Sequence, residues 1–310
     1  MPELLTLTRA QGANRALFDG GVSPSGYTLA FVDEPVLVKG FRKMVRGLEY
    51  DVAEMALTTY LTAREHGAAF TALPIFLVRG FHHGKTQVLR DGPIKNPKDL
   101  DGGRVGVNRG YTVTAGVWAR AALAEGGLDL DSVTWVLSGD EHVATYVAPA
   151  NVVPAPSGRS LEDMLIAGEL DAVVNAGIDH PDVVPLIADP TEAGMTMLLE
   201  RGIFPINHLV VVKDSLLAEH PDLSVALFES FAEAKRRYVR ELGEGLAEGK
   251  DDRLLGRVLA ETGDDPLPYG LEANRPVLTE LLDHARDQHI LTKPVALEDV
   301  FVANTLTLHD

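Results

Sequence analysis

Strand-like runs alternate with helical patterns along almost the whole chain, and this alternation limits the folds that the sequence can adopt. Residues 104–108, RVGVN, read as a strand, and residues 114–127, TAGVWARAALAEGG, read as a helix with a glycine stop. Strands that alternate with helices are typical of α/β proteins, in which a helix returns the chain to the start of the next parallel strand. We therefore predict an α/β fold with mainly parallel sheets. Further strands are expected at 4–8, 27–33, 50–56, 132–137 and 208–213, a long helix at 224–242 and a surface loop at 150–160.

Two irregular stretches divide this pattern. Residues 90–103, RDGPIKNPKDLDGG, are rich in proline, glycine and charge, and residues 200–209, ERGIFPINHL, form a second break. A chain that crosses between two lobes at both points has a discontinuous first lobe. The sequence therefore predicts one lobe from residues 1–88 and 207–310, and a second lobe from residues 89–206.

The charge of the chain restricts its partners. It carries 45 acidic and 28 basic residues, a formal net charge of −17. Nucleic acids and anionic membranes attract positively charged surfaces, so neither is an expected partner. No apolar run approaches the roughly 20 residues of a membrane-spanning helix. We expect a small-molecule ligand, and a homo-oligomer is compatible with this composition.

The N-terminal sequence and the absence of cysteine bear on location. The first residues, MPELLTLTRAQGANRALFDG, lack the basic region and the apolar core of a secretory signal. A lipoprotein anchor needs a cysteine, and the chain has none. We therefore expect a cytoplasmic protein without disulfides, thiolate nucleophiles or cysteine zinc sites.

Polar side chains gather where the predicted strands end. In open α/β sheets, ligands bind outside the carboxyl ends of the strands. That rule collects one set of candidate site residues: Glu54, Thr58, Arg79, His82, His83, Arg109, Tyr111, Thr112, Thr114, Asn175, Asn207 and His208.

The segment NRGYTVTAG, residues 108–116, has the features of an anion site. It joins a strand end to a helix start, where unpaired backbone N–H groups and the helix dipole attract negative charge. Thr112 or Thr114 can add a hydroxyl donor, and Arg109 can bind a carboxylate through two parallel hydrogen bonds. The alternative is that Thr112 only caps the helix and that Arg109 is solvated. The lysine and glycine spacing of a phosphate-binding loop is absent.

Three histidines are candidates for proton transfer near neutral pH. Side chains alternate along an extended strand, so at most one of His82 and His83 points inward, and both can instead be solvated. His208 opens an apolar strand, where a buried structural histidine is the alternative. No metal-binding motif, dinucleotide fingerprint or nucleophile elbow occurs, so neither a metal nor a cofactor is expected. A divalent cation held by Glu54, His83 and His208 is the one metal site that the candidates suggest.

Four blocks of the sequence resemble the 4,5-dihydroxyphthalate decarboxylase family. They are YDVAEMALTTYL, GVNRGYTVTAGVWAR, GIFPINHLVVVKDSLLAEHPDL and DPLPYGLEANRPVL, which begin at residues 50, 106, 202 and 265. Residues 95–123 and 161–174 also resemble the second lobe of a type II periplasmic-binding-protein fold. Two positions depart from the family pattern: Ala121 replaces a glycine, and His82 stands where an arginine is common.

The resemblance implies a two-lobed type II periplasmic-binding-protein-like fold with a ligand cleft between the lobes. It also implies a cofactor-independent carboxy-lyase that acts on a hydroxylated aromatic carboxylate. Arg79 and Arg109 would anchor carboxylates, and His208 or His83, which aligns with the family's histidine, would donate a proton, with Glu54 assisting at a hydroxyl. The alternatives are a solute-binding protein for an acidic small molecule and a menaquinone-pathway-type lyase on the same fold.

Overall fold

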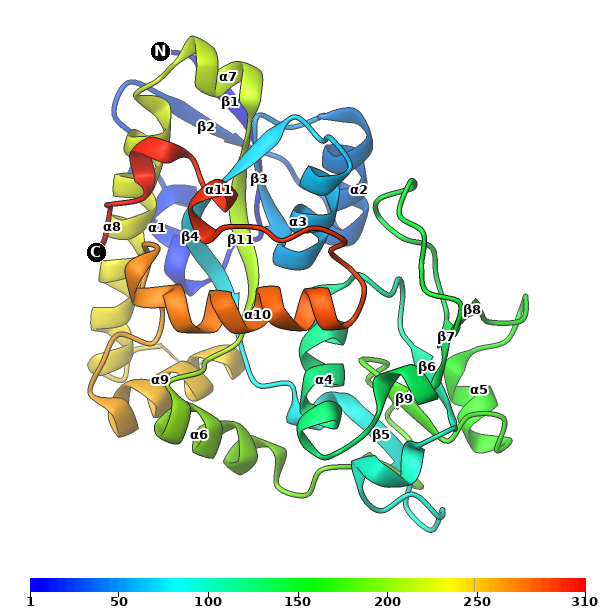
Figure 1. Cartoon of the computed structure of the whole chain (residues 1–310). Helices are drawn as coiled ribbons and strands as arrows, with labels where there is room; N and C mark the ends of the chain where they lie inside the picture. Colours follow the sequence, from blue (N-terminus) through cyan, green and yellow to red (C-terminus); the bar gives the residue numbers. More distant parts are fainter. Residues whose placement is uncertain (248) are drawn as a thin grey trace. The chain divides into compact units, whose positions relative to one another are not determined.

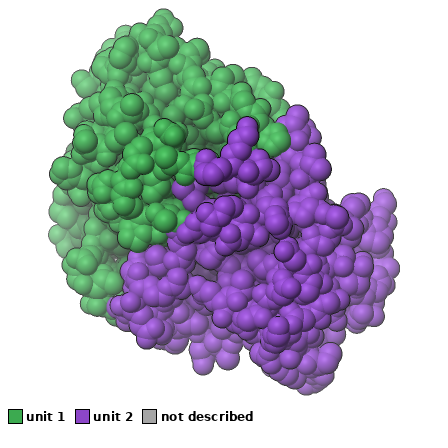
Figure 2. All heavy atoms as spheres, in the orientation of Figure 1, with its two compact units in different colours: residues 1–80, 206–279, 295–310 green, residues 81–205, 280–294 purple. Residues whose placement is uncertain are grey.

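A computed structural model of the protein describes residues 1–247 and 249–310 (Figure 1). Its contacts divide the chain into two compact units. Unit 1 comprises residues 1–80, 206–279 and 295–310, and unit 2 comprises residues 81–205 and 280–294 (Figure 2). Among the described residues, no helix is both long and apolar enough to span a bilayer.

Unit 1 is built on a five-stranded mixed sheet with the order β2-β1-β3-β11-β4. The strands are β1 (Glu3–Leu7), β2 (Thr28–Phe31), β3 (Val52–Ala56), β4 (Phe70–Arg79) and β11 (Ile206–Lys213). β1 runs parallel to β2 and β3, whereas β11 runs antiparallel to β3 and β4. All five residues of β3 are buried, as expected for a strand covered on both faces. The central strand therefore places Glu54 in the interior of the unit.

Helices cover this sheet, and one of them depends on a glycine. A Cβ atom on Gly40, in α2, would lie 2.5 Å from Leu7 Cδ2, so the missing side chain lets α2 pack closely on β1. The helices of unit 1 are α1 (Arg15–Phe18), α2 (Leu37–Gly47), α3 (Leu57–Glu65), α7 (Asp214–Glu219), α8 (Leu223–Gly243), α9 (Lys250–Thr262) and α11 (Leu297–Val300), with short 3₁₀ helices at Gly12–Asn14, Glu272–Asn274 and Ala303–Thr305. α10 (Arg275–Asp287) begins in unit 1 and ends in unit 2.

Unit 2 has its own six-stranded sheet with the order β10-β5-β9-β6-β7-β8. The strands are β5 (Thr86–Leu89), β6 (Arg104–Val107), β7 (Thr134–Leu137), β8 (Val152–Pro154), β9 (Ala172–Val174) and β10 (Val183–Pro185). β6 runs parallel to β7 and β9, and β7 runs parallel to β8, whereas β5 runs antiparallel to β9 and β10. Its helices are α4 (Thr114–Glu125), α5 (Leu161–Ile166) and α6 (Pro190–Arg201), with 3₁₀ helices at His83–Lys85, Pro97–Leu100 and Leu130–Ser132.

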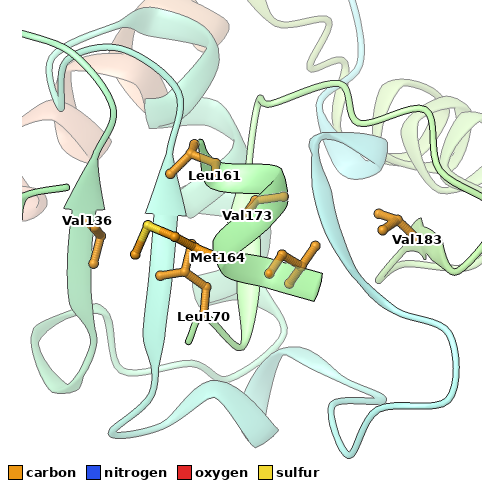
Figure 3. Close-up of a cluster of buried hydrophobic side chains, with 7 residues drawn as sticks. Val136, Leu161, Met164, Leu170, Val173 and Val183 are labelled. Carbon is orange, nitrogen blue, oxygen red and sulfur yellow. The ribbon is translucent and has the colours of Figure 1, made fainter. Parts of the chain in front are cut away.

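The core of unit 2 forms where α5 packs on the sheet. Leu161 and Met164 of α5 belong to one buried apolar cluster with Val136 of β7 and Val173 of β9 (Figure 3). A Cβ atom on Gly106 would lie 2.8 Å from Leu170 Cδ1 and 2.9 Å from Leu161 Cδ2, so the missing side chain makes room for both leucines to pack on β6. This packing fixes the strands whose ends carry several of the candidate site residues.

The α/β class is confirmed, and each strand predicted from the sequence overlaps an observed strand. The differences lie in two short strands. The stretch 150–160, expected to be a loop, contains β8; β8 and β10 are three-residue edge strands, too short to give a clear sequence pattern. The sheets are rich in parallel pairings, as predicted, and they are mixed because β5 and β11 run antiparallel to their neighbours.

The contacts also group two segments differently from the predicted lobes. Residues 81–88 and 280–294 cluster with unit 2, whereas the sequence division placed them in the first lobe. Gln288 shows why the second segment belongs there. Its side-chain amide donates to the carbonyl of Val117 at 3.0 Å, and its oxygen accepts from Nε of Arg120 at 2.7 Å, which ties the end of α10 to α4.

Candidate functional site

A buried carboxylate and a histidine form a close pair on adjacent strands of unit 1. Oε1 of Glu54, on β3, lies 2.6 Å from Nδ1 of His208, on β11. The backbone N–H of Arg9 donates to Oε2 at 3.0 Å, and Nη2 of the same arginine donates to Oε1 at 3.2 Å. The side chain of Glu54 is fully buried, so these donors replace the water that the carboxylate has lost. Arg9 was not among the residues singled out from the sequence.

The local electrostatics fix the protonation of this pair. Burial on its own raises the pKa of Glu54, but the hydrogen bond to His208, the charges of His208 and Arg9 and the Arg9 backbone N–H outweigh it and hold the pKa below its ordinary value. The carboxylate is therefore ionised at neutral pH and can only accept hydrogen bonds, so Nδ1 of His208 carries a proton. Nε2 is then the ring nitrogen that can exchange a proton with a ligand.

The surroundings of His208 orient its ring and leave one side open. The ring of Phe41, on α2, meets the imidazole edge to face, with centroids 5.3 Å apart and planes at 87°. The pairing of β11 with β4 is irregular on both sides of His208, as in bulges that re-aim a side chain. The His208 side chain is 19% exposed, and Nε2 has no hydrogen-bond partner among the residues that the structure describes. This arrangement can present one titratable nitrogen to a ligand.

The other candidates of unit 1 lie in more enclosed positions. Thr58 is fully buried in the first turn of α3, where its carbonyl accepts from the hydroxyl of Thr62 at 2.7 Å. Asn207 precedes His208 on β11, and its Oδ1 is buried without a hydrogen-bond partner in the described part of the chain. Glu54, which the sequence placed at a ligand hydroxyl, instead lies behind His208 with both oxygens occupied.

Two hydrogen bonds of the Arg79 side chain lie inside unit 1. Its guanidinium donates to the carbonyl of Pro268 at 3.2 Å and to Oδ1 of Asn274, and it lies over the ring of Phe76. Burial lowers the pKa of Arg79 to about 10, although the negative charge of Asp265 opposes this effect. These contacts give the partly buried arginine a structural role, and its role as a carboxylate anchor stays a prediction.

In unit 2, the predicted anion site holds a carboxylate of the protein itself. The backbone N–H of Tyr111 donates to Oε1 of Glu141, and Thr112 donates to Oε2 from its backbone N–H at 3.2 Å and from its hydroxyl at 2.6 Å. α4 begins at the buried Thr114 with Val113 as its N-cap, so Thr112 is not the cap. The sequence thus identified donors that attract an anion, but gave no sign that Glu141, about 30 residues further on, fills the position.

Two strand ends of unit 2 adopt left-handed backbone conformations at residues other than glycine. Arg109 follows β6 with φ of 72°, and Asn175 follows β9 with φ of 57°. This conformation costs a non-glycine residue roughly 1–2 kcal/mol, and bonds from the surrounding structure hold it. The backbone N–H of Arg109 donates to the Ser138 hydroxyl at 2.9 Å, and the Asn175 carbonyl accepts from Nδ2 of Asn108 at 2.9 Å. The guanidinium of Arg109 is exposed and has no hydrogen bond or ion pair with any described residue, so it is available to an anion.

The buried Arg120, on α4, contacts the loop that precedes this helix. Nη2 of Arg120 donates to the carbonyl of Tyr111 at 2.7 Å, and its guanidinium lies 3.9 Å from the centroid of the Tyr111 ring. Burial lowers the pKa of Arg120. The electrostatic interactions with Tyr111, Tyr146 and Glu141 oppose this shift. Sequence reasoning did not select Arg120, because a helical arginine usually extends into solvent.

His82 and His83 lie beside α4. They line a small pocket with Trp118 and Glu125 of that helix, and the ring of His82 stacks on that of Trp118 with centroids 6.5 Å apart. Burial lowers the pKa of His83, and the charge of Glu125 opposes that shift. No group of three or more acidic or histidine side chains in the described ranges is arranged to hold a metal ion.

Replacing Glu141 with alanine is expected to lower the free energy of unfolding by about 1–3 kcal/mol. The substitution leaves the backbone N–H groups of Tyr111 and Thr112 without their acceptor at a partly buried position. Chemical denaturation of the two proteins measures the difference. Glu141→Gln, which keeps one acceptor oxygen, should lose less, and equal stability of all three proteins would show that the bonds contribute nothing.

Comparison with curated proteins finds two relatives that share one description. A 4,5-dihydroxyphthalate decarboxylase of Comamonas testosteroni is 31% identical over 297 residues, which cover 87% of this chain and 88% of that protein. A protein of the same name from Pseudomonas putida is 34% identical over 197 residues, which cover 58% of this chain and 74% of that protein. Comparison with models of protein families finds no match.

Solved structures with similar folds include a binding protein and an enzyme. The aliphatic sulphonate binding protein SsuA of Escherichia coli superposes with a TM-score of 0.54 at 14% identity, covering 99% of this chain and 100% of that chain. The desulfurization enzyme DSZB gives a TM-score of 0.56 at 16% identity, covering 99% and 98%. A Candida albicans gene product with the generic periplasmic-binding-protein fold gives 0.57 at 12% identity, with the same coverage. These similarities establish a periplasmic-binding-protein-like fold.

Proposed function

We propose that this chain, which belongs to the 4,5-dihydroxyphthalate decarboxylase family, is a cofactor-independent decarboxylase of a hydroxylated aromatic carboxylic acid. The observation that carries the proposal is the contact of 2.6 Å between the buried Glu54 and His208, with Nε2 of the histidine left open. A solute-binding protein needs no such pair to hold an acid, whereas a decarboxylase must deliver a proton to carbon.

The reaction needs one proton and an electron-donating ring. The ring carbon that bears the carboxylate takes a proton from the imidazolium, and a hydroxyl para to that carbon gives up its own proton to form a dienone-like intermediate. The bond to the carboxylate then breaks, its electron pair restores the aromatic ring, and CO₂ leaves. The phenolic oxygen regains a proton, so the net change is the uptake of one proton, the loss of CO₂ and the replacement of the carboxylate group by one hydrogen atom.

The residues of unit 1 would divide this work. His208 would protonate the ring carbon from Nε2. Glu54 would stabilise the imidazolium and hold Nδ1–H in place, so that the reactive nitrogen always faces the ligand. Arg9 would keep Glu54 ionised by its charge and its backbone N–H.

Arg109 of unit 2 remains the proposed carboxylate ligand of that unit. Its guanidinium is exposed and has no partner among the described side chains, in contrast to Arg79, which is bonded to Pro268 and Asn274. Residues with strained backbone conformations cluster at functional sites. Arg109 adopts such a conformation after the end of β6. Tyr111, Thr112, Thr114 and Asn175 would shape the surroundings of this arginine rather than contact the reacting carbon.

A solute-binding protein for an acidic small molecule is the second candidate. The observation in its favour is the fold, which the chain shares with the sulphonate-binding protein SsuA. Arg109 would serve such a protein equally well. The two functions differ in whether the bound acid is recovered unchanged.

Incubation with phthalate, 4-hydroxyphthalate and 4,5-dihydroxyphthalate, followed by measurement of CO₂ and aromatic products, tests the proposal. We expect CO₂ only from the hydroxylated acids, because phthalate has no hydroxyl to stabilise the protonated ring. Tight binding of all three acids with complete recovery would establish the binding function instead. Equal rates with phthalate would refute the role given to the hydroxyl.

A further inference from the structure

Unit 1 contains a recess whose lining residues, apart from Arg9, have no role in the proposed reaction. It lies at the carboxyl ends of the parallel strands β1 and β2, and its volume is about 500 Å³. Pockets of this size are typical of small-molecule sites, and the carboxyl ends of strands are where ligands bind in open α/β sheets. We call it the β1–β2 recess; the residues of its lining that matter here are Arg9, Phe18, Phe31, Asp33 and Leu37.

The wall of the recess is aromatic. Phe18 and Phe31 stack with ring centroids 3.8 Å apart and planes at 16°, and both rings are only partly buried. Partly exposed aromatic faces favour contact with another flat apolar group. An aromatic ring of a ligand would satisfy this wall better than an aliphatic chain would.

Two opposite charges flank the wall. Arg9 is half exposed and uses Nη2 on Glu54, whereas its remaining guanidinium nitrogens have no partner among the described residues. The carboxylate of Asp33 is exposed and is likewise unpaired within the described part of the chain, whereas its neighbour Glu34 is paired with Lys43 at 2.8 Å. The register of β1 and β2 pairs Thr6 with Phe31, which places Arg9 and Asp33 on adjacent strand ends.

The recess is connected to the proton-transfer pair by two routes. Arg9 lines the recess and also donates to Glu54. Leu37 lines the recess from α2, and Phe41, one turn further along the same helix face, contacts the ring of His208. A ligand in the recess is therefore separated from Glu54 by Arg9 alone, and from His208 by Leu37 and Phe41 of α2.

We infer that the β1–β2 recess binds the ring of an aromatic acid, with Arg9 bound to a carboxylate and Asp33 accepting hydrogen bonds from ring hydroxyls. The inference rests on the proposed function for the reaction that the bound acid undergoes. The binding of the acid does not depend on that reaction. Asp33 then selects hydroxylated rings, because an unsubstituted ring leaves the carboxylate without a donor. Arg9 both positions Glu54 and binds the substrate.

Equilibrium binding of benzoate and 3,4-dihydroxybenzoate, measured by calorimetry, tests the inference without requiring turnover. The wild-type protein should prefer the dihydroxy acid. Asp33→Asn should reduce that preference by roughly 3- to 10-fold and leave benzoate binding nearly unchanged. Arg9→Gln should weaken both acids by about 10-fold or more, because it removes a charged hydrogen bond.

Arg64→Gln is the matched control for Arg9. Arg64 is also partly exposed and pairs with one carboxylate, Asp214, at 3.1 Å, but it lies outside the recess. Its substitution should leave both affinities unchanged. An unaltered preference in Asp33→Asn, or unaltered affinities in Arg9→Gln, would overturn the inference.

The positioning role of Arg9 has a separate readout in the pH dependence of turnover. Glu54 is faced by His208 from β11 and by Arg9 from the end of β1. Loss of the arginine charge should move the acid limb of the rate to higher pH in Arg9→Gln, and Arg9→Lys should restore it. If the acid limb of Arg9→Gln stays at the pH of the wild type, Arg9 does not position Glu54. If no acid is decarboxylated but the binding pattern holds, the proposed reaction fails and the binding site stands.

Discussion

Replacing His208 with glutamine is expected to lower the turnover number by about 10²–10⁴-fold, the usual range for the loss of a general acid–base group. Glutamine keeps a hydrogen-bonding amide at this position beside Glu54, but it has no titratable proton to transfer. The side chain is partly exposed, so the fold should survive the change. Steady-state kinetics at saturating substrate measures the effect, and thermal unfolding shows that the variant is folded.

His83→Gln is the matched control for this experiment. His83 lines a small pocket beside α4 and belongs to unit 2, whereas Glu54 and His208 belong to unit 1. Its substitution should leave turnover within a few-fold of the wild type. A near-normal rate for the His208 variant together with a large loss for the His83 variant would transfer the proton-donating role to His83.

Replacing Lys235 with methionine is expected to lower the free energy of unfolding by about 3–5 kcal/mol. The side chain of Lys235, on α8, is fully buried, and its ammonium contacts Asp265 and lies 2.6 Å from Oδ2 of Asp310. Asp310 is itself buried and accepts the backbone N–H of Tyr269 at 2.9 Å, so the lysine holds the C-terminal residue of the sequence against the unit. Removal of the ammonium leaves a buried carboxylate without a counter-charge.

A double variant separates lost packing from lost charge compensation. Lys235→Met combined with Asp310→Asn removes both charges of the buried pair, and it should recover a large part of the stability because paired removal costs far less than removal of one partner. Chemical denaturation of the wild type, both single variants and the double variant gives the coupling energy. Simple additivity of the two single effects would show that the pair is not coupled.

The features that the sequence could predict depend on local pattern. Alternating strand-like and helical runs gave the α/β class, because the periods of the two elements differ over a few residues. Glu54 was selected at the end of one predicted strand and His208 at the start of another, where the chain was expected to cross between lobes, and the structure brings them into contact. The segment before α4 was recognised as attractive to anions, since unpaired N–H groups at a helix start do not depend on what binds them.

The features that the sequence could not predict depend on distant contacts. Arg9 reaches Glu54 across 45 positions, and no local pattern distinguishes it from a solvated arginine. Glu141 occupies the predicted anion site from a loop whose conformation follows from tertiary packing. Lys235 interrupts the apolar face of α8 at a buried position, which only its partnership with two distant aspartates makes tolerable. The bond from Arg79 to the carbonyl of Pro268 spans 189 positions, and no local pattern indicates it.

The rate of CO₂ release from 4,5-dihydroxyphthalate, measured on the wild-type protein after exhaustive dialysis against a chelator, tests the proposed mechanism directly. We expect decarboxylation at an unchanged rate, because the proton comes from His208 and the electrons from the hydroxylated ring. No release, or release restored only by adding a divalent ion, would contradict a cofactor-independent decarboxylase that depends on the Glu54–His208 pair.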